Sequence, residues 1–300
     1  MRSLKLRALV SSLMAAGLVV TLTGTAAGTS SVPRDAIDLG GGAYAQELKK
    51  ESPKWYTPRL HKRVVAAGKK GRTVPLPEHA NVPQSALLFT GIRPGSWMLS
   101  PSWCTMNFVF GGTDSIGTAG HCAQVGDEVT LVAAPGVLMA IGTTTKSVDG
   151  GIGNDFALVD VYPAMEQYVN PSMAIVAGPT GSKAPALGDG ILHVGHGLAI
   201  GTGGTPRAGV VTYPNFPVAG DIFGQDKNDA DAYGWNGAVT PGDSGSAARA
   251  VTGEAVGNVT HLVIGTDYVP STFVGTTIGR MLEIAGQPLS TASLVPDPLH

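Results

Sequence analysis

The sequence predicts an all-β domain, and three observations support this. Short runs rich in valine, leucine, phenylalanine and threonine recur between glycine, aspartate and proline turns from about residue 84 onward. Glycine makes up 42 of the 300 residues, about twice its usual share of roughly 7%. Charged residues are only 14%, against roughly 25% in an average soluble protein. No heptad pattern is sustained, so a coiled coil or helical bundle is disfavoured.

The first 27 residues have the layout of an export leader. Three basic residues near the start precede an apolar run from Ala8 to about Leu22, and small residues around Ala27 offer a cleavage site. This is the pattern of a secretory signal peptide. The apolar run is shorter than the ~20 residues that a membrane span needs. We therefore expect a secreted, extracellular protein with no membrane attachment after cleavage.

A basic segment separates the leader from the main domain. Residues 46–72 hold nine Lys/Arg and two Glu, whereas residues 73–300 hold seven Lys/Arg and eighteen Asp/Glu. Residues 28–80 show little periodicity, so we predict a flexible pro-segment or linker there, followed by the main domain at 81–300. The opposite charges favour docking of the segment on the domain, although a solvated tail fits equally. The acidic domain lacks the basic groove that a nucleic-acid partner needs.

Seven runs of the domain are predicted as strands and one as a helix. The strand runs are Cys104–Phe110, Glu128–Ala133, Val137–Thr143, Asp155–Val161, Ile191–Val194, Gly209–Tyr213 and Ala255–Ile264. The run Thr276–Ala285 groups its apolar residues on one face and stops before Gly286, which is typical of a closing helix. Many short strands with one late helix favour a β-barrel domain over alternating βαβ units.

Cys104 and Cys122 are the only cysteines of the chain. In an exported protein a single pair favours a disulfide over two buried thiols. The bridge would close a loop of about 18 residues and stabilise the fold by roughly 3 kcal/mol.

Three short stretches carry candidate chemistry. They are Gly117–Cys122 around His121, Gly153–Val159 around Asp155 and Thr240–Ser246 around Ser244. Each is weak alone, but together they supply a nucleophile, a base and an orienting acid. A serine needs an imidazole to take its proton, and the imidazole needs a buried carboxylate to fix its tautomer. The flanking glycines let the backbone N–H groups of Gly242 and Ser244 converge on one spot as an oxyanion hole.

In these motifs and their order the chain resembles the chymotrypsin-like serine proteases of the bacterial secreted type. The matching stretches are Thr118-Ala119-Gly120-His121-Cys122, Asp155-Phe156-Ala157-Leu158-Val159 and Gly242-Asp243-Ser244-Gly245. The resemblance covers about residues 84–287. It implies two six-stranded antiparallel β-barrels packed together, with a C-terminal helix. It also implies a secreted, monomeric serine endopeptidase that acts on protein or peptide substrates without a cofactor or metal, made as a zymogen with an intramolecular pro-segment.

The resemblance implies a role for each matched residue. Ser244 would be the nucleophile, and His121 the general base and then the general acid. Asp155 would orient His121. Thr260 falls near the position of a family serine that bonds the catalytic aspartate, so its hydroxyl is expected to do the same. The alternative for Thr260 is an ordinary strand threonine.

Asp243 lies beside the nucleophile and needs a partner. A carboxylate turned inward is costly unless it is paired. The chain has no Arg/Lys-Ile-Val-Gly-Gly activation site, and Arg207 is one of only seven basic residues after position 72. We therefore expect an ion pair between Arg207 and Asp243.

Two positions of the expected specificity pocket depart from the family. Ala238, six residues before Ser244, replaces the usual floor residue and argues against a pocket for lysine or arginine. Leu262, two residues after Thr260, stands where the family often has glycine and would narrow the pocket. We expect a preference for small or medium apolar residues. Alignment around 225–240 leaves room for a pocket carboxylate from one of three residues, namely Asp226, Asp229 or Asp231.

Two other functions use the same residues. A non-catalytic protease homologue would act as a secreted binding or adhesion protein, and an esterase would use the same triad. A zinc site at His193, His196 and His261 is disfavoured, because flanking glycines and strand patterning favour structural roles for these histidines.

Overall fold

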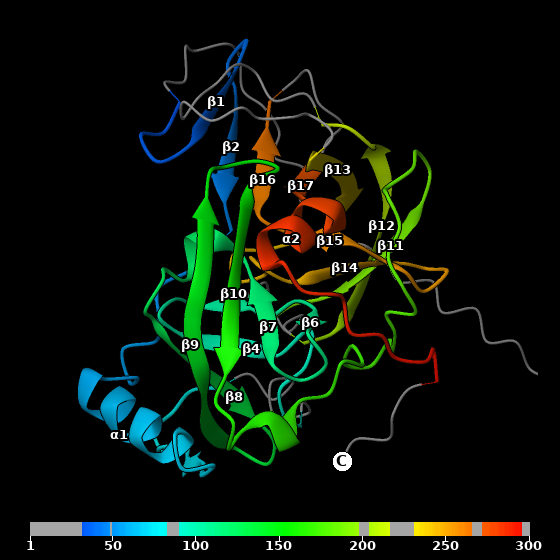
Figure 1. Ribbon diagram of the computed structural model, residues 1–300. Helices are drawn as coiled ribbons and strands as arrows, with labels where there is room; N and C mark the ends of the chain where they lie inside the picture. The colour runs from blue at the N-terminus through cyan, green and yellow to red at the C-terminus, as the bar shows by residue number, and fades with distance from the viewer. Residues whose placement is uncertain are drawn as a thin grey trace, which may run out of the picture. The chain divides into compact units, whose positions relative to one another are not determined.

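Two antiparallel β-sheets carry most of the regular structure (Figure 1). The structure, a computed structural model, describes residues 32–48, 50–82, 90–197, 204–216, 231–265 and 272–295. The predicted leader at 1–27 lies outside these residues. In the part of the chain that the structure describes, no helix is long and apolar enough to cross a membrane.

The first sheet contains the histidine and aspartate motifs. Its strands are β3 (Val74–Pro75), β4 (Trp97–Ser100), β5 (Cys104–Thr105), β6 (Val109–Phe110), β7 (Ser115–Thr118), β8 (Glu128–Ala133), β9 (Val137–Asp149) and β10 (Asp155–Val161). Neighbours follow the order β5-β4-β8-β9-β10-β7-β6, and β3 pairs with β9. Every pair is antiparallel.

The second sheet contains the strands on either side of the serine motif. Its strands are β1 (Ile37–Gly40), β2 (Ala43–Glu47), β11 (Gly190–Val194), β12 (Pro206–Tyr213), β13 (Ala232–Gly237), β14 (Ala247–Ala250), β15 (Ala255–Asn258), β16 (His261–Ile264) and β17 (Thr272–Thr276). Neighbours follow the order β1-β2-β16-β17-β13-β12-β11-β14-β15. Two curled antiparallel sheets are therefore present as predicted. Among the described residues they have eight and nine strands instead of six each, partly because β1, β2 and β3 join them.

Helix α2 (Ile278–Ala285) confirms the predicted closing helix. The Thr277 hydroxyl accepts a hydrogen bond from the N–H of Arg280 at its start, and Gly286 ends it with φ of 63°, which favours glycine. Its buried residues Ile278 and Met281 belong to a hydrophobic cluster with Phe110 and Phe156 of the first sheet. Short 3₁₀ helices occur at Gly120–Cys122 and Glu166–Tyr168.

Two predicted strands are interrupted where they pass the serine loop. The run 104–110 divides into β5 and β6, and the run 255–264 divides into β15 and β16. At the first break the N–H of Thr105 donates to the carbonyl of Ser244 at 2.8 Å. At the second, the N–H of Gly245 donates to the carbonyl of Val259 at 2.7 Å. Backbone groups that would continue a strand ladder instead hold the loop that carries Ser244.

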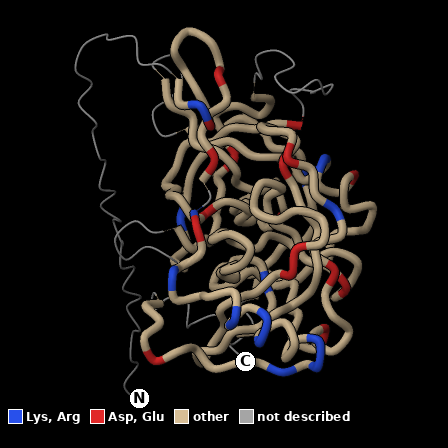
Figure 2. Tube along the Cα trace, turned by 90° about the vertical axis from the view of Figure 1, so that its left-hand side faces the viewer, with Lys and Arg blue, Asp and Glu red and all other residues tan. Residues whose placement is uncertain are grey.

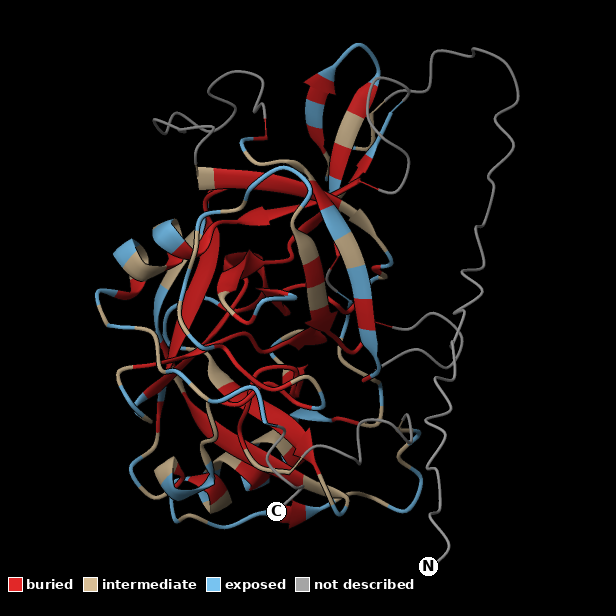
Figure 3. Cartoon of the chain, turned by 90° about the vertical axis from the view of Figure 1, so that its right-hand side faces the viewer, coloured by how far each residue is buried: buried red, intermediate tan, exposed pale blue. Residues whose placement is uncertain are grey.

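The expectation of a flexible segment at 28–80 is wrong for the part that the structure describes. This part forms β1, β2, helix α1 (Pro58–Gly68) and β3. The hydroxyl of Thr57 accepts a hydrogen bond from the N–H of Leu60 at 3.2 Å and so caps α1. The helix buries Leu60, Val64 and Gly68. In β1 and β2, buried residues alternate with more exposed ones (Figure 3).

Helix α1 and the residues on either side of it cover the face of the first sheet that points away from the interior of the half-barrel. Alternate residues of β4, β8 and β9 belong to different clusters, as the two-residue period of a strand requires. One cluster lies in the interior of the half-barrel and contains Met98, Leu131, Ala133, Met139 and Ile141. The residues between them, Trp97, Leu99, Val132, Leu138 and Ala140, form a cluster with Tyr56, Leu60, Val64 and Val74. A Cβ on Gly68 would lie 2.2 Å from the carbonyl oxygen of Ala140, so α1 approaches β9 closely.

The charges of the basic segment do not prevent this docking. Arg59, Lys62 and Arg63 are exposed on α1 while its apolar face is buried. Charged residues are sparse along the described chain, with long stretches that carry neither sign (Figure 2).

Candidate active site

The structure brings the side chains of His121, Asp155 and Ser244 into one hydrogen-bonded chain. Nδ1 of His121 lies 2.6 Å from Oδ2 of Asp155, and Nε2 of His121 lies 2.7 Å from Oγ of Ser244. All three residues are buried. His121 comes from the 3₁₀ helix after β7, Asp155 opens β10, and Ser244 lies in the turn before β14. Both sheets therefore contribute to the site.

Backbone contacts fix the histidine against the aspartate. A Cβ on Gly120 would lie 1.9 Å from the carbonyl oxygen of Val148, so only glycine lets the turn of His121 pack against β9. The N–H of His121 donates to Oδ1 of Asp155 at 3.1 Å. The N–H of Asp155 in turn donates to Oγ1 of Thr276 at 3.0 Å. The relative positions of ring and carboxylate are thus set by more than their mutual hydrogen bond.

The surroundings of Asp155 keep it ionised. Complete burial by itself would raise the pKa of this carboxyl. The charge and the hydrogen bonds of His121, together with the charge of His261, outweigh burial and hold the pKa of Asp155 below its usual range. A carboxylate in this place stabilises the imidazolium that forms when His121 accepts a proton.

The turn around Ser244 requires glycine after the serine. Gly245 has φ of +86°, and a Cβ there would lie 2.4 Å from the carbonyl oxygen of Thr105. The Oγ of Ser244 also lies 3.3 Å from the carbonyl oxygen of Thr260. The serine hydroxyl is therefore positioned between His121 and the start of β16.

Arg207 and Asp243 form the expected buried ion pair. Asp243 is fully buried, and its carboxylate also accepts hydrogen bonds from the N–H of Gly197 at 2.6 Å and the N–H of Thr240 at 2.8 Å. These contacts compensate the buried charge of Asp243 and hold the turn that carries Ser244.

The N–H of Gly242 donates to the carbonyl oxygen of Leu48. The N–H of Leu48 donates to the carbonyl of Thr260 at 3.1 Å. A carbonyl of the chain therefore lies at one of the two backbone donors that the sequence predicts for an oxyanion hole.

The expected role of Thr260 is wrong. Its hydroxyl donates to the carbonyl of Val274 at 3.1 Å and lies 2.8 Å from Nδ1 of His261, not at Asp155. His261 is instead the neighbour of the aspartate, with Nδ1 3.9 Å from Oδ2 of Asp155. The rings of His261 and His121 meet edge to face at 5.8 Å. Sequence reasoning considered His261 only as a metal ligand, although its place beside Thr260 pointed to the site.

The residues expected in the specificity pocket lie on different elements. Ala238 is exposed, and its carbonyl accepts a hydrogen bond from Nε2 of His193 at 2.9 Å. Leu262 lies half-buried on β16 and packs against the hydrophobic cluster that contains Leu48. Asp231 precedes β13, where its carbonyl accepts a hydrogen bond from the N–H of Thr277 at 2.9 Å. The other two candidate carboxylates, Asp226 and Asp229, lie outside the described residues.

The disulfide Cys104–Cys122 is present. It joins β5 to the 3₁₀ helix that carries His121. These two cysteines and His121 are the only cluster of metal-ligating side chains among the described residues, but the two sulfurs are bonded to each other. His193 and His196 are buried, and burial lowers the pKa of both, that of His196 to about 3. Both are therefore neutral imidazoles at physiological pH.

Two curled antiparallel sheets, a closing helix and a Ser–His–Asp chain at their meeting point define a chymotrypsin-like fold. No family model matches the chain, and no curated protein matches it. Three of the similar solved structures are bacterial proteins. Cellulomonas bogoriensis chymotrypsin is 19% identical (68% of this chain, 98% of that chain, TM-score 0.46). Thermobifida fusca protease A is 22% identical (67% and 98%, TM-score 0.47). Nocardiopsis protease is 18% identical (67% and 98%, TM-score 0.44).

Proposed function

We propose that the protein is a secreted serine endopeptidase. The observation that carries this proposal is the unbroken chain from Asp155 through His121 to Ser244, with contacts of 2.6 and 2.7 Å between buried side chains. His121 takes the proton of Ser244 as Oγ attacks a peptide carbonyl. His121 then gives that proton to the leaving amine, and water hydrolyses the acyl-enzyme by the same steps in reverse order.

The backbone N–H groups of Gly242 and Ser244 stabilise the oxyanion of this reaction. The contact between Gly242 and a peptide carbonyl supports the assignment. Losing one such donor typically costs about 10²–10³ in rate. The Arg207–Asp243 pair positions these donors, because Asp243 lies between Gly242 and Ser244.

Specificity is for small or medium apolar residues before the cut bond. Ala238 offers no charge to a lysine or arginine side chain, and Leu262 borders an apolar cluster. In a peptide panel we expect faster cleavage after alanine, valine or leucine than after lysine or arginine. Residues 1–27 direct export, and the enzyme acts as a monomer on protein or peptide substrates.

Active-site labelling tests the proposal. A fluorophosphonate should label the secreted protein and lose its target in Ser244→Ala, while Ser246→Ala, two residues away, remains labelled. Peptide hydrolysis should fall by about 10⁴-fold or more in Ser244→Ala. A binding or adhesion protein would show neither labelling nor hydrolysis. An esterase would be labelled, but would hydrolyse an ester without measurable cleavage of the matched amide.

A further inference from the structure

Residues 43–48 add an antiparallel strand to β16, the strand that follows Thr260. Strand β2 pairs with β16, with Gln46 opposite Leu262 and Ala45 opposite Val263. The pairing continues to the site itself, because the N–H of Leu48 donates to the carbonyl of Thr260 and the carbonyl of Leu48 accepts from Gly242. The addition of an extended peptide as a strand at the edge of a sheet is a recurrent mode of peptide recognition.

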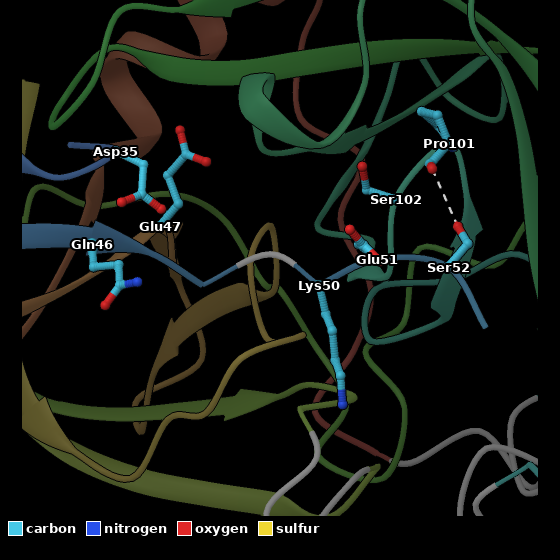
Figure 4. A pocket seen from close by; sticks show the side chains of 8 residues that line it. All are labelled: Asp35, Gln46, Glu47, Lys50, Glu51, Ser52, Pro101 and Ser102. Carbon is cyan, nitrogen blue, oxygen red and sulfur yellow. Dashed lines mark hydrogen bonds between the residues drawn. The ribbon is translucent and has the colours of Figure 1, made fainter. Parts of the chain in front are cut away.

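Beyond the site, the residues that follow this segment contact the loop between β4 and β5 of the first sheet. The N–H of Lys50 donates to the carbonyl of Trp103 at 3.2 Å, and the N–H of Trp103 donates to the carbonyl of Lys50 at 2.8 Å. Trp103 precedes Cys104, whose disulfide partner Cys122 follows His121. Figure 4 shows the chain continuing from β2 past Lys50 to Ser52, whose hydroxyl donates to the carbonyl of Pro101. Residues 43–48 therefore contact the second sheet and residues from Lys50 onward the first, and Leu48 shares with the Ser244 hydroxyl the carbonyl of Thr260 as a hydrogen-bond acceptor.

Leu48 is the largest fully buried side chain of this segment. It is 2% exposed and shares a hydrophobic cluster with Val211, Tyr233 and Val239. Gln46, two residues earlier, is exposed. Backbone pairing along the strand and one buried side chain beside the oxyanion donor are the features that a substrate needs at a peptide-cleaving site.

We propose that this segment is the enzyme's own first substrate, and that Ser244 cuts the bond after Leu48; this inference rests on the proposed function. Oγ of Ser244 bonds to the Leu48 carbonyl carbon, and the bond to the nitrogen of Lys49 breaks. His121 transfers the serine proton to that nitrogen. Water then releases Leu48 as a carboxylate and restores the serine, so one water is consumed for each bond cut.

Two consequences follow from this cut. The pocket takes leucine, so peptides with leucine before the cut bond are the preferred class of external substrate. The pro-segment ends at Leu48, well before residue 80. Residues 50–82 remain with the enzyme because they cover one face of the first sheet.

N-terminal sequencing and intact mass of the full chain test the inference. The wild type should begin at Lys49, whereas Ser244→Ala should retain the residues before it. Leu48→Asp should also remain uncut, because its carboxylate does not enter an apolar pocket, while the matched control Leu187→Asp, at a leucine that is 74% exposed, should be cut normally. Leu48→Ala keeps a small apolar side chain and should slow self-cleavage at least tenfold. In a peptide panel, leucine should exceed lysine before the cut bond by at least about tenfold.

The outcomes separate this inference from the proposed function. If the wild type hydrolyses peptides and reacts with a fluorophosphonate but begins elsewhere than Lys49, the self-cleavage is wrong and the protease stands. If wild type and Ser244→Ala both begin at Lys49, another protease makes the cut and the inference is overturned. If neither the wild type nor Leu48→Asp reacts or hydrolyses, the proposed function itself fails.

Discussion

Two arms of the N-terminal stretch meet the same domain in different ways. The cleft arm, residues 32–48, pairs through β2 with the edge of β16, and its last residue, Leu48, bonds to the backbone of Thr260 and Gly242. The docked arm, residues 50–82, buries side chains of α1 and β3 against the first sheet. The arms differ in charge: residues 32–48 carry one Arg and three Asp/Glu, whereas residues 50–82 carry eight Lys/Arg and two Glu. The difference teaches that the two arms are attached in different ways: the cleft arm is an added strand at a sheet edge, whereas side chains of the docked arm are buried against a sheet face.

The docked arm is required because the first sheet is apolar on both faces. The runs Trp97–Leu99, Leu131–Ala133 and Leu138–Ile141 are apolar at every position, and such runs are typical of strands covered on both sides. One face belongs to the interior of the half-barrel and the other to the cluster with α1. Loss of the docked arm would expose that second face to water.

The largest expected effect comes from a charge beneath the docked arm. Val64→Asp places an unpaired carboxylate at a fully buried position of α1, which should lower the free energy of unfolding by about 3–5 kcal/mol. Denaturant unfolding measures this loss. The control Lys62→Asp, on the exposed side of α1, should cost less than about 1 kcal/mol. Equal losses in the two variants would show that α1 does not hold the sheet.

An aspartate introduced into the cleft arm tests the difference between the two arms. Ala45→Asp at a buried position of β2 should detach the arm and leave the remaining fold intact. In a Ser244→Ala background, where the arm stays attached, limited proteolysis should cut before Leu48 while the melting temperature changes far less than in Val64→Asp. A cooperative loss of the whole fold would contradict the distinction between the arms.

A methyl group on Gly68 should have a smaller effect of unexpected sign. Helix propensity alone predicts that Gly68→Ala stabilises α1 by about 1 kcal/mol. The new Cβ would lie 2.2 Å from the carbonyl oxygen of Ala140, so we expect a net loss of about 1–3 kcal/mol in the free energy of unfolding. Ala66→Gly at an exposed position reports the propensity alone, with a loss of about 0.5–1 kcal/mol. A stabilised Gly68→Ala would mean that α1 is not pressed against β9.

The features that depend on short motifs could be predicted from the sequence. The features that depend on contacts between residues far apart in the chain could not. The relay partners His121, Asp155 and Ser244 each sit in a motif whose residues build the local turn, so their meeting could be expected. The docking of α1 (Pro58–Gly68) could not, because its evidence lies in distant strands that begin at Trp97, Glu128 and Val137. The role given to Thr260 failed because its hydroxyl donates to the carbonyl of Val274, and it is His261 whose ring lies near Asp155.

A fall in pH should weaken the attachment of the docked arm to the sheet, because His61 becomes protonated. Burial lowers the pKa of His61 from 6.5, against the opposing charges of Glu128 and Asp127. The unfolded chain therefore takes up a proton near pH 6.5 before the folded protein does, so the stability contributed by neutral His61 is present above that pH and is lost as the pH falls. His61→Gln should flatten the decline of the melting temperature between pH 7 and pH 5. An unchanged slope would assign that decline to other groups, including the buried His196.

The smallest expected effect is that of the exposed ion pair at the end of α1. Nζ of Lys69 lies 2.8 Å from Oε1 of Glu128, with the lysine side chain 53% exposed. Exposed pairs contribute about 0–1 kcal/mol and are screened by salt. Lys69→Met should therefore lower the free energy of unfolding by less than about 1 kcal/mol at low salt, and the difference from wild type should vanish near 1 M salt. A larger, salt-insensitive loss would mean that charge, and not the apolar face of α1, holds the docked arm to the sheet.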